Sequence, residues 1–161
     1  MCGSNSLQTI MLTPLPPIEY QRKLSYRPSL EEVYTAYDLI NLHVFDNKLI
    51  RPEIRIGRRR GVLGWCWSYI RPRKTGSTCI ILLTNKWCCI QWLYSILAHE
   101  MVHQYQSDID RKDRELLGKG MLMKHGPNFF IHRNKLAQSG IILKSRYGLH
   151  HWLVYQDFKK C

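Results

Sequence analysis

The sequence predicts an α+β domain in which a small sheet of three or more strands packs on a long helix. Three observations predict it. A capped amphipathic segment covers residues 29–49, three short strand-like runs follow between residues 53 and 84, and a long apolar segment without Gly or Pro covers residues 88–108. Strands that gather before the second helix, instead of alternating with helices, favour the α+β class over a parallel α/β sheet.

Length and composition bound the organisation of the chain. Its 161 residues suit one compact domain, and 45% of them are hydrophobic, which favours a globular protein over a disordered one. Residues 1–28 include Pro14, Pro16 and Pro17, which oppose regular structure. We therefore predict a flexible N-terminal tail over residues 1–28 and a single domain over residues 29–161.

Targeting signals and cysteines favour a cytoplasmic protein. No run of about 18 uncharged apolar residues marks a membrane span, and no basic region followed by a long apolar stretch opens the chain. The six cysteines follow no disulfide-framework spacing, so free thiols are the simplest interpretation. We expect a monomer in the cytoplasm of a bacterial or phage-infected cell, with no membrane partner, associated with the nucleoid if it binds DNA.

The first predicted helix begins at Ser29, which forms an S-x-x-E capping box with Glu32. Apolar residues keep a spacing of three or four along this helix, at Leu30, Val33, Tyr37, Ile40 and Val44. Strand-like runs follow at residues 53–57, 61–70 and 77–84, with glycines between or within them for turns and bulges.

Two histidines lie one turn apart in the segment at residues 88–108, which predicts a largely buried helix. Residues four apart share a helix face, so His99 and His103 of the stretch HEMVH can aim at one point and hold a Zn²⁺ ion. Glu100 lies about 100° round the helix, near enough to accept a proton from a zinc-activated water without being a ligand. The alternative is two ordinary helix histidines in core or surface hydrogen bonds.

A catalytic zinc needs a third protein ligand and one open position. His125 is the best candidate, because it precedes Gly126, where the backbone can turn tightly, at the start of a helix predicted over residues 125–140. Pro127 suits the first turn of that helix. His132 is the competitor, about two turns further along nearly the same face, and a supporting or phosphate-facing role fits it better.

The residues around these histidines resemble one protein family. The stretches LAHEMVHQYQ, DRKDRE and HGPNF, with INLHVFDNKLIRPEI, GVLGWCWS and CIILLT before them, are similar to the SprT-like zinc metalloprotease domain, which includes the Spartan-like DNA–protein crosslink proteases. The resemblance covers roughly residues 30–142. H-E-x-x-H combined with H-G-P-x-F is far more specific than H-E-x-x-H alone.

This resemblance implies a compact zincin-like metalloprotease domain that cleaves proteins bound or crosslinked to DNA, with a role in DNA repair. It implies one catalytic Zn²⁺ ion held by His99, His103 and His125, with Glu100 as the general base. It also implies that DNA, single-stranded or with single-stranded character, is the activator. The chain departs from the family in a longer stretch between His103 and His125, and it lacks the cysteine-based zinc element of some members.

The charge balance favours a polyanionic partner. Twenty-four Lys and Arg residues against twelve Asp and Glu residues give a formal net charge of +12, and each phosphate that such a surface neutralises releases a counterion. A basic surface kept for solubility is the alternative. The candidate DNA contacts are the residues of two basic clusters: Arg58, Arg59, Arg60, Arg71, Arg73 and Lys74.

Aromatic residues lie between these basic clusters, as in proteins that bind single-stranded DNA. We nevertheless predict that Trp65, Trp67 and Tyr69 pack the core, because aromatic runs of period two usually cover a half-buried sheet. For a protein substrate, we expect residues 77–84 to be the exposed strand beside the metal to which an extended peptide adds.

Other assignments stay open at this point. Tyr105, Tyr147, His150 and His151 are unranked candidates for stabilising the oxyanion. The alternative function is a nucleic-acid-binding module with a structural or inactive zinc site, and a metallohydrolase acting on a non-protein amide would use the same chemistry. Glu100 favours an enzyme, since a purely structural site needs only the ligands.

Overall fold

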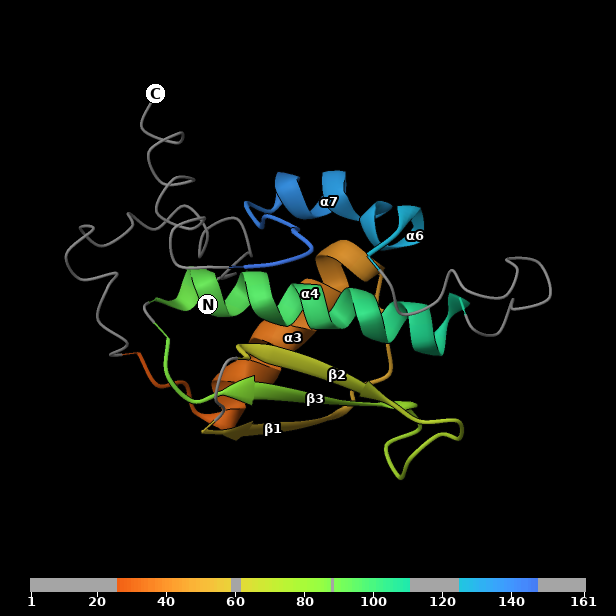
Figure 1. Ribbon diagram of the computed structural model, residues 1–161, viewed down its shortest axis with the longest axis horizontal. Coiled ribbons are helices and arrows are strands. Elements are labelled where there is room, and N and C mark those ends of the chain that lie inside the picture. The colour runs from red at the N-terminus through yellow and green to blue at the C-terminus, as the bar shows by residue number, and fades with distance from the viewer. Residues whose placement is uncertain (1–25, 59–61, 88, 111–124, 148–161) are drawn as a thin grey trace, which may run out of the picture.

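The computed structural model describes residues 26–58, 62–87, 89–110 and 125–147. They form a mixed α+β arrangement in three layers: a small sheet, then the helices α3 and α4, then the short helices α6 and α7 (Figure 1). The predicted α+β class with a small sheet is confirmed. The predictions for most of the N-terminal tail, for most of the stretch between His103 and His125, and for His150 and His151 lie outside the described residues.

Helix α3, Leu30–Phe45, forms as its capping box predicts. The Ser29 hydroxyl accepts a hydrogen bond from the Glu32 N–H at 3.1 Å, and the Glu32 carboxylate accepts one from the Ser29 N–H at 2.6 Å. The helix ends at Asp46, whose backbone is left-handed with φ 54°. Of the five apolar positions predicted to share a face, Leu30 is exposed, and four are buried in the core: Val33, Tyr37, Ile40 and Val44.

The sheet has the strand order β1-β3-β2, with β1 at Glu53–Gly57, β2 at Gly64–Ser68 and β3 at Cys79–Thr84. Strand β3 pairs with β1 in parallel and with β2 in antiparallel orientation. The prediction that residues 77–84 supply an exposed strand is therefore wrong, because β3 is paired along both edges. Its consecutive apolar residues are buried or half-buried, as is typical of a central strand. Among the described strands, β2 pairs with β3 on one side only, and its other edge lies next to α4.

The aromatic residues of β2 face away from the helices. Trp65 and Trp67 are each 55% exposed, whereas Cys66 between them is buried against α4. The prediction that these two tryptophans pack the core is wrong. A period of two shows which side chains share a face of a strand, but not which of the two faces is buried. Tyr69 follows the strand and is half-buried.

Helix α4, Ile90–Asp108, is buried along nearly its whole length, because the sheet covers one side and α6 packs on the other. Its C-terminal end is held by Asp108. This carboxylate accepts hydrogen bonds of 2.8 Å from the Ser77 hydroxyl and from the Thr78 N–H, immediately before β3. Within the described part of the chain, none of the helices combines the length and apolarity that a membrane span requires.

The segment predicted as one helix over residues 125–140 forms two short ones. These are α6, Pro127–Phe130, and α7, Arg133–Gln138. Pro127 occupies the first turn of α6, as predicted. Gly140, with φ 75°, follows the end of α7.

Candidate metal centre

Three imidazoles converge where α4 meets the start of α6. The ligand atoms of His99, His103 and His125 all lie within 4.8 Å of one another. The Nε2 atom of His125 lies 3.1 Å from Nε2 of His103 and 3.2 Å from Nε2 of His99. The predicted convergence of these three residues is confirmed. His132 lies elsewhere, with its ring edge-on to Phe45 at 4.8 Å.

The other ring nitrogens of the two helix histidines are held by acceptors. His99 Nδ1 donates to the carbonyl oxygen of Lys144 at 2.8 Å, and His103 Nδ1 donates to Oε1 of Gln106 at 2.8 Å. A proton on Nδ1 leaves a lone pair on Nε2 in a neutral imidazole. Both Nε2 atoms therefore carry free lone pairs, and both point toward Nε2 of His125. In metal sites, hydrogen bonds to the other ring nitrogen orient the histidine ligands in this way.

The ring of Phe129 supports all three imidazoles. Phe129 is fully buried, and its ring centroid lies 4.8 Å from that of His99, 4.9 Å from His103 and 4.7 Å from His125. These contacts are edge-on or tilted, an arrangement that aromatic pairs favour. One apolar side chain thus limits the tilt of each imidazole.

Burial keeps these imidazoles neutral. It lowers the pKa of His99 to about 3, helped by the neighbouring His103. Burial also lowers the pKa of His103 and that of His125, which the cation of Arg146 lowers further. A metal ligand must be deprotonated, so the three side chains are in the ligating state at neutral pH.

These residues fit a metal ion. Lone pairs that face one another repel unless a cation lies between them, and a tetrahedral zinc with bonds of about 2.0–2.1 Å separates its nitrogen ligands by roughly 3.3 Å. The observed Nε2 separations of 3.1 and 3.2 Å are close to that value. Three imidazoles suit zinc, copper, nickel and iron, so the donor set is that of a transition-metal site.

Glu100 lines the same pocket without belonging to the group of ligands. The pocket is lined by the three histidines, by Glu100 and by three residues of β2, namely Gly64, Trp65 and Cys66. Burial raises the pKa of the Glu100 carboxyl to about 8, and the hydrogen bond from the backbone N–H of Cys66 opposes that rise. A buried carboxyl beside three converging imidazoles is the arrangement that proton transfer at a metal centre needs.

Strand β2 presents the edge that faces away from β3 to this pocket. Hydrogen bonds from Thr84 N–H to Leu63 O and from Tyr69 N–H to Thr78 O flank its ladder with β3. Bonded pairs alternate in an antiparallel ladder, so the odd-numbered residues of β2 bond to β3 and the even-numbered ones point away from it. The backbone groups of Gly64 and Cys66 therefore face the side on which Glu100 lies.

The described candidates for an oxyanion partner have other contacts. The Tyr147 ring lies 5.5 Å from that of His99, but its hydroxyl donates to Ile142 O and accepts from Lys144 N–H. Tyr147 thus holds the segment whose carbonyl accepts from His99. The Tyr105 ring lies 4.5 Å from that of His132.

Two contributors to the site were not found from the sequence. Gln106 lies three residues after His103, a spacing that brings helix side chains together, so it had a detectable signal. Gly64 had none, because its importance comes from the close approach of another element. A Cβ atom there would lie 2.7 Å from Cγ2 of Ile96 and 2.8 Å from Oε1 of Glu100.

The structure separates the candidate DNA contacts into two places. Arg71, Arg73 and Lys74 lie between β2 and β3 and line one hollow. Arg58 follows β1 at the opposite end of the sheet, since β1 and β3 run in parallel. Arg59 and Arg60 lie outside the described residues.

Comparison with known proteins adds no family to these observations. No protein-family model matches the chain, and no curated protein is significantly similar to it.

Proposed function

We propose that this protein is a zinc-dependent endopeptidase of SprT-like type that cleaves proteins bound or crosslinked to DNA. One observation carries the proposal. The Nε2 atoms of His99, His103 and His125 converge in a pocket that also contains the carboxyl of Glu100. A site that only stabilises the fold needs ligands but no additional carboxyl.

The residues divide the chemistry between them. The three imidazoles would hold the ion, and a zinc ion there would supply a Lewis acid that polarises the scissile carbonyl and acidifies water. A cation held by the three imidazoles would favour the ionised carboxylate of Glu100 over the neutral form that burial favours. Glu100 then accepts the proton of the attacking water and passes it to the leaving amine nitrogen. The Cys66 N–H and the surrounding burial hold that carboxyl in place during both transfers.

The edge of β2 offers a binding mode for the substrate. An extended peptide that adds to this edge would pair with the backbone groups of Gly64 and with the Cys66 carbonyl, next to Glu100, whose carboxylate accepts from the Cys66 N–H. Main-chain pairing selects few side chains. Such a peptidase suits substrates that are chosen by their location on DNA, which the net charge of +12 favours as a partner.

The proposal is tested with a basic DNA-binding protein as substrate. The zinc-loaded protein is incubated with this substrate, with and without single-stranded DNA, beside the Glu100→Gln variant. The proposal expects fragments with the wild type and DNA, and none with the variant. Zinc binding and DNA binding without any cleavage would instead support a nucleic-acid-binding module with an inactive site. Cleavage of a small amide but of no protein would support a metallohydrolase of another class.

A further inference from the structure

The sheet carries exposed aromatic rings on the face turned away from α4, which we call the outer sheet face. Trp65 and Trp67 are each 55% exposed there. Side chains two residues apart on a strand are about 6.5–7 Å apart, and the Trp67 and Tyr69 rings are stacked with centroids 6.4 Å apart and planes 22° apart. The three rings thus form a row along β2.

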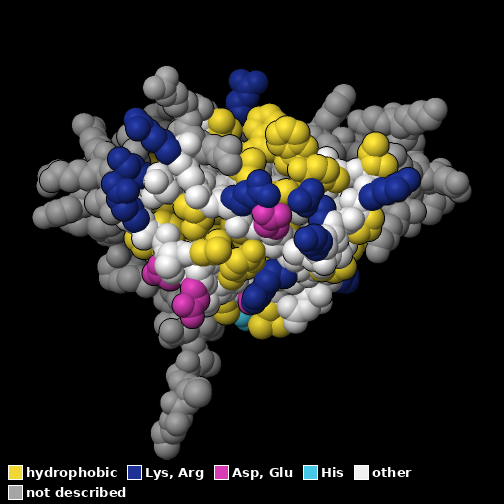
Figure 2. All heavy atoms as spheres, turned by 90° about the horizontal axis from the view of Figure 1, so that it is seen from below, with side chains coloured by type: hydrophobic (Ala, Val, Ile, Leu, Met, Phe, Trp, Pro, Cys, Tyr) yellow, Lys and Arg dark blue, Asp and Glu magenta, His cyan; other side chains and the backbone are white. Residues whose placement is uncertain are grey.

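Cations surround this row. Register places Arg55 of β1 and Trp65 of β2 on either side of Leu82, so the two side chains share the outer sheet face. The Arg73 guanidinium lies over the Tyr69 ring, 4.6 Å from its centroid. Arg71 and Lys74 are exposed beside it in one hollow. Figure 2 shows hydrophobic side chains gathered beside a band of Lys and Arg side chains on this side of the molecule.

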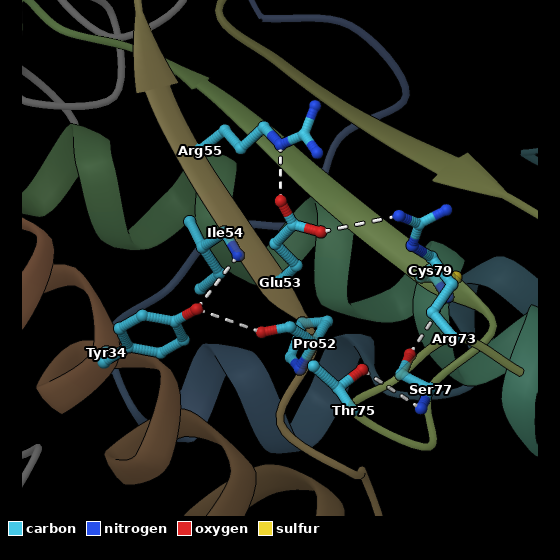
Figure 3. A network of polar contacts seen from close by, with 9 residues as sticks. All are labelled: Tyr34, Pro52, Glu53, Ile54, Arg55, Arg73, Thr75, Ser77 and Cys79. Atoms are coloured by element: carbon cyan, nitrogen blue, oxygen red, sulfur yellow. Dashed lines mark hydrogen bonds and ion pairs between the residues drawn. The ribbon is translucent and has the colours of Figure 1, made fainter.

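A single carboxylate orders two of these cations. Glu53 accepts from Arg55 at 2.6 Å and lies 3.7 Å from a terminal nitrogen of Arg73, as Figure 3 shows. The start of β1 is itself fixed, because the Tyr34 hydroxyl accepts from Ile54 N–H at 3.0 Å and donates to Pro52 O at 3.1 Å. The two guanidinium groups are therefore held in position, and their charge exceeds that of Glu53.

We infer that the outer sheet face binds single-stranded DNA, with bases stacked on Trp65 and Trp67 and phosphates bound by Arg55, Arg71, Arg73 and Lys74. Exposed aromatic rings beside cations are what an unpaired strand requires, because every base has a face that stacks while its phosphate needs a positive partner. A duplex hides its base faces and would lose the stacking contribution. The inference deepens the proposed function by naming a surface for its DNA; of its residues Trp65 also lines the metal pocket, whereas Trp67 and the four cations do not.

The charges disfavour a second copy of the chain as the occupant. Two copies packed face to face would bring Arg55, Arg71, Arg73 and Lys74 against the same cations, with one carboxylate, Glu53, contacting them on each side among the described residues. Like charges brought together at an interface oppose association. A polyanion, in contrast, is attracted by the same cluster of cations.

The position of β2 gives this surface a consequence for the proposed activity. The strand carries the tryptophans on its outer face, and its edge away from β3 lines the pocket with Glu100. DNA on the outer sheet face would therefore lie one strand away from the metal centre. A protein attached to that DNA would be held close to the pocket, which raises its effective concentration there.

Binding of a fluorescein-labelled oligothymidylate, followed by anisotropy and by tryptophan quenching, tests the inference. Trp65→Ala and Trp67→Ala should each weaken binding about tenfold or more, whereas Trp67→Phe should stay close to the wild type. Leu42→Ala is the matched control, because Leu42 is 50% exposed on α3, and it should bind like the wild type. Replacing Arg55 or Arg73 by Ala should reduce the dependence of binding on salt by about 0.7 in the logarithmic slope.

Three outcomes would overturn the inference. Tryptophan variants that bind like the wild type would show that bases do not stack there. If duplex DNA binds more tightly than single-stranded DNA, and the tryptophan substitutions change neither affinity, the basic residues alone account for binding. A wild-type dimer that dissociates in the Trp65→Ala/Trp67→Ala protein, measured by sedimentation, would make a second copy the occupant.

The Glu100→Gln variant separates this inference from the proposed function. It should bind the oligonucleotide like the wild type. If the wild type hydrolyses peptides but its DNA binding does not depend on the tryptophans, the inferred DNA-binding surface is refuted and the proposed peptidase is not. If DNA binding depends on the tryptophans but no peptide is hydrolysed, the proposed peptidase is refuted and the DNA-binding surface is not.

Discussion

The backbone N–H of Cys66 donates a hydrogen bond to the carboxylate of Glu100, and this bond joins the edge strand β2 to the helix that carries the metal ligands. The contact depends on close packing of α4 against β2. Gly64 permits that packing, since any side chain at this position would meet Ile96 and Glu100 within 3 Å. Strand, glycine and carboxyl therefore act as one unit in positioning the proposed general base.

Gly64→Ala should lower activity while zinc binding remains. The added Cβ would lie 2.7 Å from Ile96 Cγ2 and 2.8 Å from Glu100 Oε1, so the Glu100 carboxyl has to move, and overpacking should cost about 1–3 kcal/mol of stability. Gly57→Ala is the matched control, because a Cβ there meets no atom within 4 Å. Chemical denaturation, zinc titration and peptide hydrolysis measure the three effects. Unchanged hydrolysis by Gly64→Ala would show that Glu100 does not depend on this packing.

Phe129→Leu should weaken zinc binding about tenfold or more, the range expected for residues that orient ligands. The leucine removes the ring that contacts all three imidazoles at 4.7–4.9 Å between centroids. Phe130→Leu serves as the control, since Phe130 packs on Phe129 and under the Arg133 guanidinium. Competition with a chromophoric chelator gives both affinities. Equal losses in the two variants would assign the effect to general destabilisation of α6.

His132 should make the fold sensitive to acid. Burial, followed by the cations Lys135 and Lys48, lowers the pKa of His132 from 6.5 to about 4. Because the folded-state pKa is the lower one, the unfolded chain takes up its proton first as the pH falls. The free energy of unfolding should therefore fall between pH 6.5 and pH 4, by on the order of 1–2 kcal/mol after allowance for solvent at its exposed edge.

His132→Leu should remove this part of the pH dependence. The Nε2 atom of His132 is buried without a hydrogen-bond partner among the described residues, so an apolar replacement loses no hydrogen bond there. Denaturation of both proteins at pH 7 and pH 5 in chelator, which excludes metal ligation, gives the comparison. The same loss of stability on acidification in both proteins would rule out His132 as the group responsible.

The elements that sequence predicted well are those fixed by local chemistry. The capping box of Ser29 and Glu32 set the start of α3, and the spacing of His99 and His103 put both imidazoles on one helix face. His125 was predicted to be the third member from its position before Gly126. Each of these depends on residues a few positions apart.

The features that sequence missed depend on residues far apart in the chain. The prediction that residues 77–84 form an exposed strand beside the metal was wrong, because β3 lies in the middle of the sheet, where an unbroken apolar run is typical. The prediction that Trp65 and Trp67 are buried was wrong, because the alternation of side chains along a strand does not show which face of the sheet the helices cover. No glycine or proline between Phe130 and Arg133 marks the break between α6 and α7, so one helix was predicted there.

The most direct test of the metal centre and of Glu100 is hydrolysis of a quenched-fluorescent peptide library, in the presence of single-stranded DNA, by wild-type and Glu100→Gln proteins of equal, measured zinc content. The account predicts hydrolysis by the wild type that is lost on zinc removal and restored by zinc. It predicts a rate at least about 10²-fold lower for Glu100→Gln, the usual contribution of a general base. Equal hydrolysis by both proteins at one zinc per chain would contradict the role of Glu100, and a wild type that binds no zinc would contradict the metal centre itself.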